Sequence, residues 1–182
     1  MDKEGYSIVL WDRGGRQELA KIPAIGSYGS FPLWLPDGNA VVVRAVKSGT
    51  EEWFMVSRDG AIRQLTHFGG GMGLYASLSP DGNYLAFSGF NHNSGATRNL
   101  IILNLQTLEA VNTCIPFDYP PPVWSSDSQY LAVQYYDRDK KLTSVVVLDP
   151  EERWAVKIYT DSNEGEHKYY HTFPAAWLDT GE

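Results

Sequence analysis

Three features of the 182-residue sequence predict an all-β fold. One segment recurs three times along the chain, each copy contains short runs of β-branched and aromatic residues, and tight-turn motifs separate those runs. Repeats of roughly 40–50 residues with strand-like contents are typical of propeller blades. The sequence therefore predicts a β-propeller built from four-stranded antiparallel blades, with three complete blades and two half-blades.

A turn lies at the centre of each copy. The three copies are residues 31–43, 76–87 and 122–133. Their central residues are Asp37, Asp81 and Asp127, which lie 44 and 46 residues apart. The first two copies read Pro-Asp-Gly, in which proline presets one backbone angle, aspartate bonds the local backbone and glycine accepts a left-handed exit. We therefore interpret the three aspartates as turn formers rather than catalytic carboxylates.

The third copy departs from this pattern, because Ser126 and Ser128 replace the proline and the glycine. Both replacements remove a backbone preference that favours the turn. We expect the third turn to be weaker by about 1 kcal/mol.

Three strand-like runs follow the turn of each copy, and a polar turn separates the last two runs. The predicted second, third and fourth strands are 40–43, 52–56 and 61–65; 84–88, 99–103 and 108–113; and 130–134, 144–148 and 154–159. The longest candidate helix, 144–158, is β-branched and contains Pro150, so no helix is expected. The whole chain, 1–182, is predicted to be a single propeller domain with blades at about 28–66, 73–113 and 118–160.

Both ends of the sequence resemble parts of a blade. Tyr6–Leu10 and Gln17–Ile22 read as the third and fourth strands of a half-blade at 5–22. A half-blade at 168–178, predicted from a first strand at His171–Leu178, contains Trp177, 53 residues after Trp124. Open sheet edges pair readily. Three closures are compatible with this pattern: a small ring from one chain, a head-to-tail homodimer that completes a ring, or a piece of a longer propeller.

The repeat resembles the TolB-type propeller repeat, a WD-like blade. Ser79–Phe87 matches that pattern closely, and Trp34–Gly38 and Trp124–Asp127 match it with substitutions. The resemblance covers about residues 5–178 and implies the fold. Propellers of this type serve as protein-binding modules of the bacterial envelope, as gating domains of peptidases and, in some cases, as polysaccharide lyases. Fold alone does not choose among these functions.

Composition and motifs exclude several chemistries. The formal net charge of −7 makes nucleic acid and anionic membranes poor partners. The segment Gly26–Ser30 is not a nucleophile elbow, and Gly69–Gly73 lacks the lysine of a phosphate loop. Cys114 is the single cysteine and is expected to be buried. No catalytic residue, cofactor or metal is predicted.

Met1–Glu4 does not read as the start of a signal peptide. The sequence leaves the compartment open between bacterial periplasm and cytoplasm.

A binding surface is expected where loops enter the first strand of each blade and connect the second strand to the third. Aromatic and arginine side chains, which commonly form binding hot spots, gather in these loops. The predicted partner-binding rim consists of Tyr28, His67, Phe68, Phe90, His92, Arg98, Asp118, Tyr119, Tyr136, Arg138, His167, Tyr169 and His171. The leading hypothesis is a non-catalytic scaffold that binds a protein or peptide through this rim.

Two alternatives remain open at the sequence level. A carbohydrate-active propeller, resembling a polysaccharide lyase or a glycosidase, would bind a glycan and use rim histidines and acids. The second alternative is a fragment of a peptidase-associated propeller, because the sequence given holds no hydrolase domain.

Overall fold

The computed structural model describes residues 6–12, 14–22, 32–47, 49–69, 71–90, 98–117, 120–137, 139–162 and 174–177. The chain divides into two compact units, Met1–Met72 and Gly73–Glu182, which we describe separately. Every element in the described ranges is a β-strand, so the predicted all-β class is confirmed. Across those ranges, no helix is long and apolar enough to cross a membrane.

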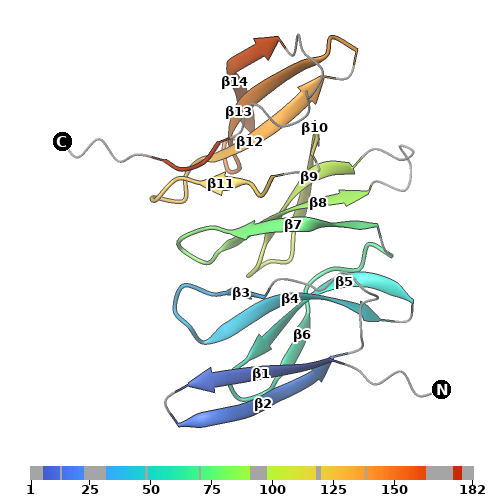
Figure 1. Cartoon of the computed structure of the whole chain (residues 1–182), viewed down its shortest axis with the longest axis vertical. Helices are drawn as coiled ribbons and strands as arrows, with labels where there is room; N and C mark the ends of the chain where they lie inside the picture. Colours follow the sequence, from blue (N-terminus) through green and yellow to red (C-terminus); the bar gives the residue numbers. More distant parts are fainter. Residues whose placement is uncertain are drawn as a thin grey trace. The chain divides into compact units, whose positions relative to one another are not determined.

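The first unit contains a two-stranded and a four-stranded antiparallel sheet (Figure 1). The two-stranded sheet pairs β1 (Tyr6–Asp12) with β2 (Gly15–Ile22). The four-stranded sheet, which we call blade one, has the order β3-β4-β5-β6. Its strands are β3 (Leu33–Trp34), β4 (Ala40–Lys47), β5 (Thr50–Ser57) and β6 (Ile62–Gln64).

The second unit contains two four-stranded sheets, with neighbouring strands consecutive in the chain. Blade two consists of β7 (Met72–Leu78), which begins at the unit boundary, β8 (Tyr84–Phe90), β9 (Arg98–Asn104) and β10 (Ala110–Pro116). Blade three consists of β11 (Val123–Trp124), β12 (Leu131–Asp137), β13 (Leu142–Asp149) and β14 (Trp154–Ser162). The three predicted four-stranded units are therefore present.

The cores form where blade faces are covered. In the second unit, Leu100 and Ile102 of β9 pack in one cluster with Val146 and Leu148 of β13, so blade three covers blade two. In blade one, Val41, Val43, Ala45, Phe54 and Val56 form a separate buried cluster on β4 and β5. Alternation along each strand places every second residue on the same face, which explains these sets.

Hydrogen bonds at the repeat turns confirm that the aspartates act as turn formers. Asp81 Oδ1 accepts bonds from the Ser79 hydroxyl at 2.5 Å and from the Asn83 amide at 3.0 Å. Asp127 repeats the arrangement one blade later, accepting from Ser125 at 2.6 Å and from Gln129 at 3.0 Å. In the first copy, Asp37 accepts from the Asn39 amide at 2.9 Å.

A second repeated contact joins consecutive blades of the second unit. The indole of Trp124 donates to the Ser77 carbonyl at 3.4 Å and stacks on Tyr84, with ring centroids 6.0 Å apart. Further along the chain, Trp177 donates to the Val123 carbonyl at 2.9 Å and stacks on Tyr130 at 6.1 Å. Trp177 thus occupies the position on blade three that Trp124 occupies on blade two.

The predicted first strand of a later half-blade is only partly supported. Residues 174–177 form no β-strand, because no ladder partner is assigned to them. The remainder of 168–178 lies outside the described residues. The predicted domain boundaries stay a prediction.

The N-terminal hairpin has the register of a third and fourth strand. In β13–β14 the pairing shifts between Val145 and Val146, and Asp149 ends the third strand. In β1–β2 the pairing shifts between Ile8 and Val9, and Asp12 ends the strand at the same spacing. A bulge at the same place in both hairpins supports the prediction of an N-terminal half-blade.

Candidate binding rim

The rim is predicted at the ends of the sheets where the second strand turns into the third. In the first unit, β4 pairs with β5 up to Lys47 and Thr50, and the loop after β6 lies at the same end. In the second unit the corresponding hairpin joins β12 to β13, whose last pair is Asp137 and Leu142.

A buried carboxylate fixes the loop after β6. Glu52, at the start of β5, is only 2% exposed. Its Oε2 accepts the Thr66 hydroxyl at 2.6 Å and the Phe68 amide at 3.1 Å, and its Oε1 accepts the Gly69 amide at 2.8 Å. Buried charge is costly unless such donors compensate it. Glu52 therefore holds residues 66–69 in one shape.

Two predicted rim residues lie in this loop. The His67 side chain is exposed, and its Nδ1 lies 3.1 Å from the Gln64 amide nitrogen. Phe68 is half-buried, with its backbone bonded to Glu52. The sequence located both residues but missed the glutamate that positions them.

A buried arginine supports the same end of blade one. Arg44 on β4 is buried, and its Nη1 donates to the Met72 carbonyl at 3.0 Å. The same nitrogen lies 3.7 Å from Glu51 Oε2. Charged residues at these strand positions made the predicted second strand end at Val43, whereas β4 extends to Lys47.

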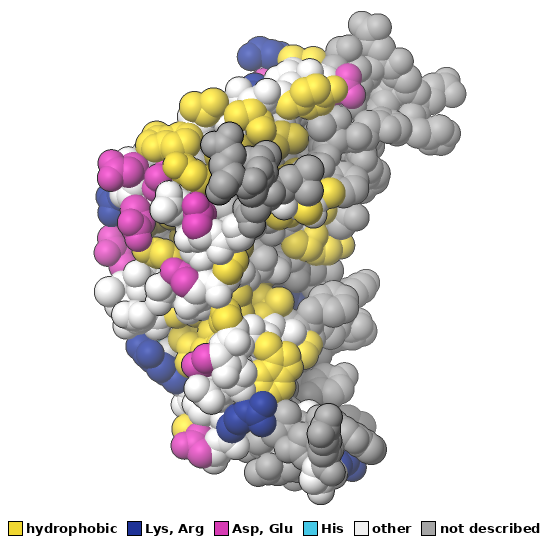
Figure 2. All heavy atoms as spheres, turned by 90° about the vertical axis from the view of Figure 1, so that its left-hand side faces the viewer, with side chains coloured by type: hydrophobic (Ala, Val, Ile, Leu, Met, Phe, Trp, Pro, Cys, Tyr) yellow, Lys and Arg dark blue, Asp and Glu magenta, His cyan; other side chains and the backbone are white. Residues whose placement is uncertain are grey.

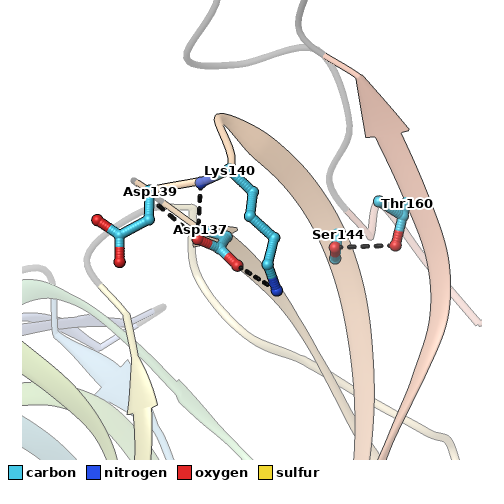
Figure 3. Close-up of polar contacts among 5 residues, drawn as sticks. All are labelled: Asp137, Asp139, Lys140, Ser144 and Thr160. Carbon is cyan, nitrogen blue, oxygen red and sulfur yellow. Dashed lines mark hydrogen bonds and ion pairs between the residues drawn. The ribbon is translucent and has the colours of Figure 1, made fainter.

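In the second unit, Asp137 organises the β12–β13 hairpin (Figure 3). Its Oδ1 accepts the amides of Asp139 at 3.2 Å and Lys140 at 3.1 Å, and its Oδ2 lies 3.5 Å from Lys140 Nζ. The bond from the Lys140 amide lowers the pKa of Asp137, and the Lys140 charge acts in the same direction, whereas burial opposes both. Ser144 and Thr160 join β13 to β14 through their hydroxyls, 3.1 Å apart.

Tyr136 and Arg98 are the other predicted rim residues whose side chains are described, and both are half-buried. The Arg98 carbonyl accepts the Phe117 amide at 3.0 Å. The Ser88 hydroxyl donates to the Phe117 carbonyl at 2.9 Å, and the Phe117 ring is buried in the core.

The remaining predicted rim residues fall elsewhere. Phe90 ends β8, and only its backbone is described. The others lie outside the described residues: Tyr28, His92, Asp118, Tyr119, Arg138, His167, Tyr169 and His171. The described residues place His67 and Phe68 in the first unit and Arg98 and Tyr136 in the second.

The opposite ends of the sheets carry exposed side chains of both charges. Asp37, Asp59 and Asp127 lie in the turns there, and so do Arg58 and Arg153. Figure 2 looks onto this side and shows carboxylate side chains among hydrophobic ones.

Two further chemistries concern the described ranges, namely metal binding and the thiol of Cys114. Within them, no three His, Cys, Asp or Glu side chains cluster closely enough to hold a metal ion.

Cys114 is exposed, so its predicted burial is wrong. The reason is local: Cys114 has φ of 58° where β10 loses its pairing between Asn112 and Pro116.

Sequence comparison connects the chain to one curated protein. No family model matches the sequence. Over 106 residues the chain is 31% identical to the TolB homologue of Chlorobium chlorochromatii (strain CaD3). The match covers 58% of this chain and 23% of that protein, so the chain spans about a quarter of the relative's length.

Solved structures share the fold. Dipeptidyl peptidase 4 of Porphyromonas gingivalis matches with a TM-score of 0.65 at 18% identity, covering 87% of this chain and 29% of the other. A protein assigned as TolB in Agrobacterium tumefaciens matches with a TM-score of 0.60 at 18% identity, covering 85% of this chain and 56% of the other. An oligogalacturonate lyase in complex with manganese matches with a TM-score of 0.56 at 19% identity, covering 74% of this chain and 40% of the other. The repeated turns, the four-stranded sheets and these likenesses show that the chain has the fold of β-propeller blades and that its sequence is similar to a TolB homologue.

Proposed function

We propose that this chain is a non-catalytic propeller scaffold that binds a protein or peptide through the rim. The observation that carries the proposal is the Glu52 arrangement, in which three donors hold a buried carboxylate beneath the loop of His67 and Phe68. A loop fixed before binding loses less conformational entropy when a partner docks. An exposed imidazole beside a half-buried phenyl ring then offers one polar and one apolar contact.

The second unit offers a comparable surface of its own. Asp137 and Lys140 fix the hairpin that follows Tyr136. Aromatic side chains carry much of the binding energy in protein interfaces when the surrounding structure is rigid. Tyr136 is therefore the corresponding candidate in this unit.

Peptides selected from a random phage-displayed library against the wild-type chain test the proposal. Phe68→Ala should weaken the binding of the selected peptides at least about tenfold, as expected for an aromatic hot spot. Glu52→Gln keeps the rim side chains but removes the charge that holds their loop, so it should also weaken binding. Trp34→Ala is the matched control, since it removes an exposed aromatic at the opposite end of blade one.

Equal affinities for the wild type, Phe68→Ala and Tyr136→Ala would contradict the rim. A library that yields no binding peptide would contradict protein or peptide recognition. The carbohydrate-active alternative would gain support from a glycan-array signal that these variants abolish. Circular dichroism of each variant establishes that the fold is retained.

A further inference from the structure

A cavity lies between the outer strands of blades two and three, within the second unit. Its volume is about 400 Å³, and it is lined by Ile102 and Val111 of one blade and by Leu148 and Ala155 of the other. Val111 pairs with Ile102 and Ala155 pairs with Leu148, so each pair lies on one face of its sheet. Ile102 and Leu148 belong to the buried cluster that joins the two blades, which gives the cavity a packed apolar floor.

Two features of the chain leave this space unfilled. Ala155 has no atom beyond Cβ with which to reach across, and the β10 wall departs from regular pairing. Pairing between β9 and β10 is lost between Asn112 and Pro116, where the Thr113 hydroxyl donates instead to the Leu100 carbonyl at 3.0 Å. The wall is therefore irregular but held in place, and the cavity has the volume of a typical ligand pocket.

The solvent-exposed side of the cavity, which we call its mouth, carries an excess of negative charge. Among the described residues, the charged side chains that line the cavity are Glu109, Asp149, Glu151 and Arg153, three carboxylates against one guanidinium. Arg153 lies 3.5 Å from Glu109, and these side chains are 67% and 68% exposed. Solvent screens such an exposed pair, so a cationic ligand can compete for Glu109.

A tyrosine from blade two fixes the position of Glu151, which belongs to the β13–β14 turn of blade three. The Tyr84 hydroxyl donates to Glu151 Oε1 at 3.0 Å. Burial raises the pKa of Tyr84, and the bond to Glu151 acts in the same direction, so the phenol keeps the proton that it donates. None of the described residues donates to Glu151 Oε2, so this oxygen is available to a ligand.

We propose that this cavity binds an arginine side chain of a peptide partner. The aliphatic stem lies on Val111 and Ala155, and the guanidinium reaches Glu151 and Glu109, one carboxylate from each blade. The charge of the mouth favours a cation, and the apolar floor favours a ligand with an aliphatic stem. Two carboxylates on different elements favour the planar fork of arginine over the compact ammonium of lysine. The cavity lies at the turn ends of the sheets, opposite the predicted rim, and does not depend on the rim.

A titration followed by two-dimensional amide NMR tests the proposal with a defined probe. The probe is the blocked peptide acetyl-Gly-Ile-Arg-Ile-Gly-amide, and a second peptide replaces its arginine with citrulline, which removes the charge and keeps the shape. The arginine peptide should bind saturably and shift the amide signals of Val111 and Ala155. The citrulline peptide, or the arginine peptide with Glu151→Gln, should bind about tenfold more weakly. Glu152→Gln is the matched control, because it removes the same charge from the adjacent residue outside the cavity lining. Its affinity should stay within about twofold of the wild type at physiological salt.

Filling the cavity tests its shape independently of its charge. Ala155→Phe places a ring in the cavity from an exposed strand position, so it should abolish binding of the arginine peptide. Ala110→Phe is the matched control, since Ala110 pairs with Leu103 on the other face of blade two. Circular dichroism establishes that each variant is folded.

Three results would overturn the proposal. They are a wild type that does not bind the arginine peptide saturably, equal affinities for the arginine and citrulline peptides, and binding that survives both Glu151→Gln and Ala155→Phe. The rim is tested with library-selected peptides and Phe68→Ala, so either proposal can fail without the other.

Discussion

Ser128 combines two opposing effects in the third repeat turn. It adopts φ of 65°, where the first two turns have Gly38 at 69° and Gly82 at 75°. A non-glycine residue in this region costs about 1–2 kcal/mol. The Ser128 hydroxyl, however, accepts the Asp81 amide of the preceding blade at 3.0 Å. A bond of this kind contributes about 1 kcal/mol, which offsets much of the weakening expected from sequence.

The same turns give stability a dependence on acidic pH. Burial raises the pKa of Asp81, but bonds from Ser79 and Asn83 outweigh it and bring the pKa below the ordinary value of 3.8. A bond from Ser125 similarly lowers the pKa of Asp127. A carboxyl group with a lower pKa in the folded state stabilises the fold above its unfolded pKa, and this contribution disappears as pH falls through the folded pKa.

We predict that the free energy of unfolding falls as pH is lowered from about 5 through 3.8 toward the lowered pKa values. Asp81→Asn cannot titrate, so its stability should be lower at pH 7 but less dependent on pH in this window. Urea unfolding at a series of pH values measures both quantities. Parallel curves for Asp81→Asn and wild type would contradict the assignment.

At the scale of elements, turn chemistry and strand pattern predicted most of the fold. Pro-Asp-Gly motifs locate the turns before β4 and β8, and apolar runs locate the second, third and fourth strands. Strand ends were less predictable, because buried ion pairs and hydrogen bonds allow charged residues inside strands. Arg44 and Glu52 are examples, since both are buried in strands.

The rim stays a prediction, and the geometry around its described residues could be anticipated from sequence only in part. Loop positions and residue types indicated His67 and Phe68 correctly as neighbours of one strand end. The loop that carries them is held by hydrogen bonds to Glu52 from residues 14 to 17 positions further along the chain. A local sequence pattern does not predict contacts over such a separation. A glutamate in an otherwise apolar strand was the one available signal.

Two glycines test how closely blade two is packed. A Cβ at Gly73 would lie 2.5 Å from the Ser88 hydroxyl and 2.6 Å from its Cβ. Ser88 is fully buried and bonded to Phe117, so it cannot move away freely. A Cβ at Gly89 would lie 2.6 Å from Ile101 Cδ1, the flexible end of a side chain.

We therefore predict that Gly73→Ala destabilises the chain by about 2–3 kcal/mol and Gly89→Ala by about 1 kcal/mol. The difference should appear as a lower urea midpoint for Gly73→Ala at an unchanged slope. Equal urea midpoints for the two variants would contradict this prediction, because they would mean that Ser88 is displaced as easily as the end of the Ile101 side chain.

At the scale of the whole molecule, the repeat specifies how blades follow one another but not where the series closes. Trp124 and Trp177 make the same pair of contacts on successive blades. Such a contact can repeat on any number of blades, so it does not determine how many blades there are. Closure depends instead on contacts between segments far apart in sequence, which no single repeat specifies. This is why the pattern of the sequence was compatible with three different closures.

Thermal unfolding distinguishes these closures without chromatography. If two chains complete one ring as a head-to-tail homodimer, unfolding also dissociates them, so Tm must rise with protein concentration. With about 0.7 kcal/mol of unfolding enthalpy per residue, the 182-residue chain as a dimer should gain about 2 °C for each tenfold increase. A Tm of the wild type that is independent of concentration would instead favour a contact made within one chain.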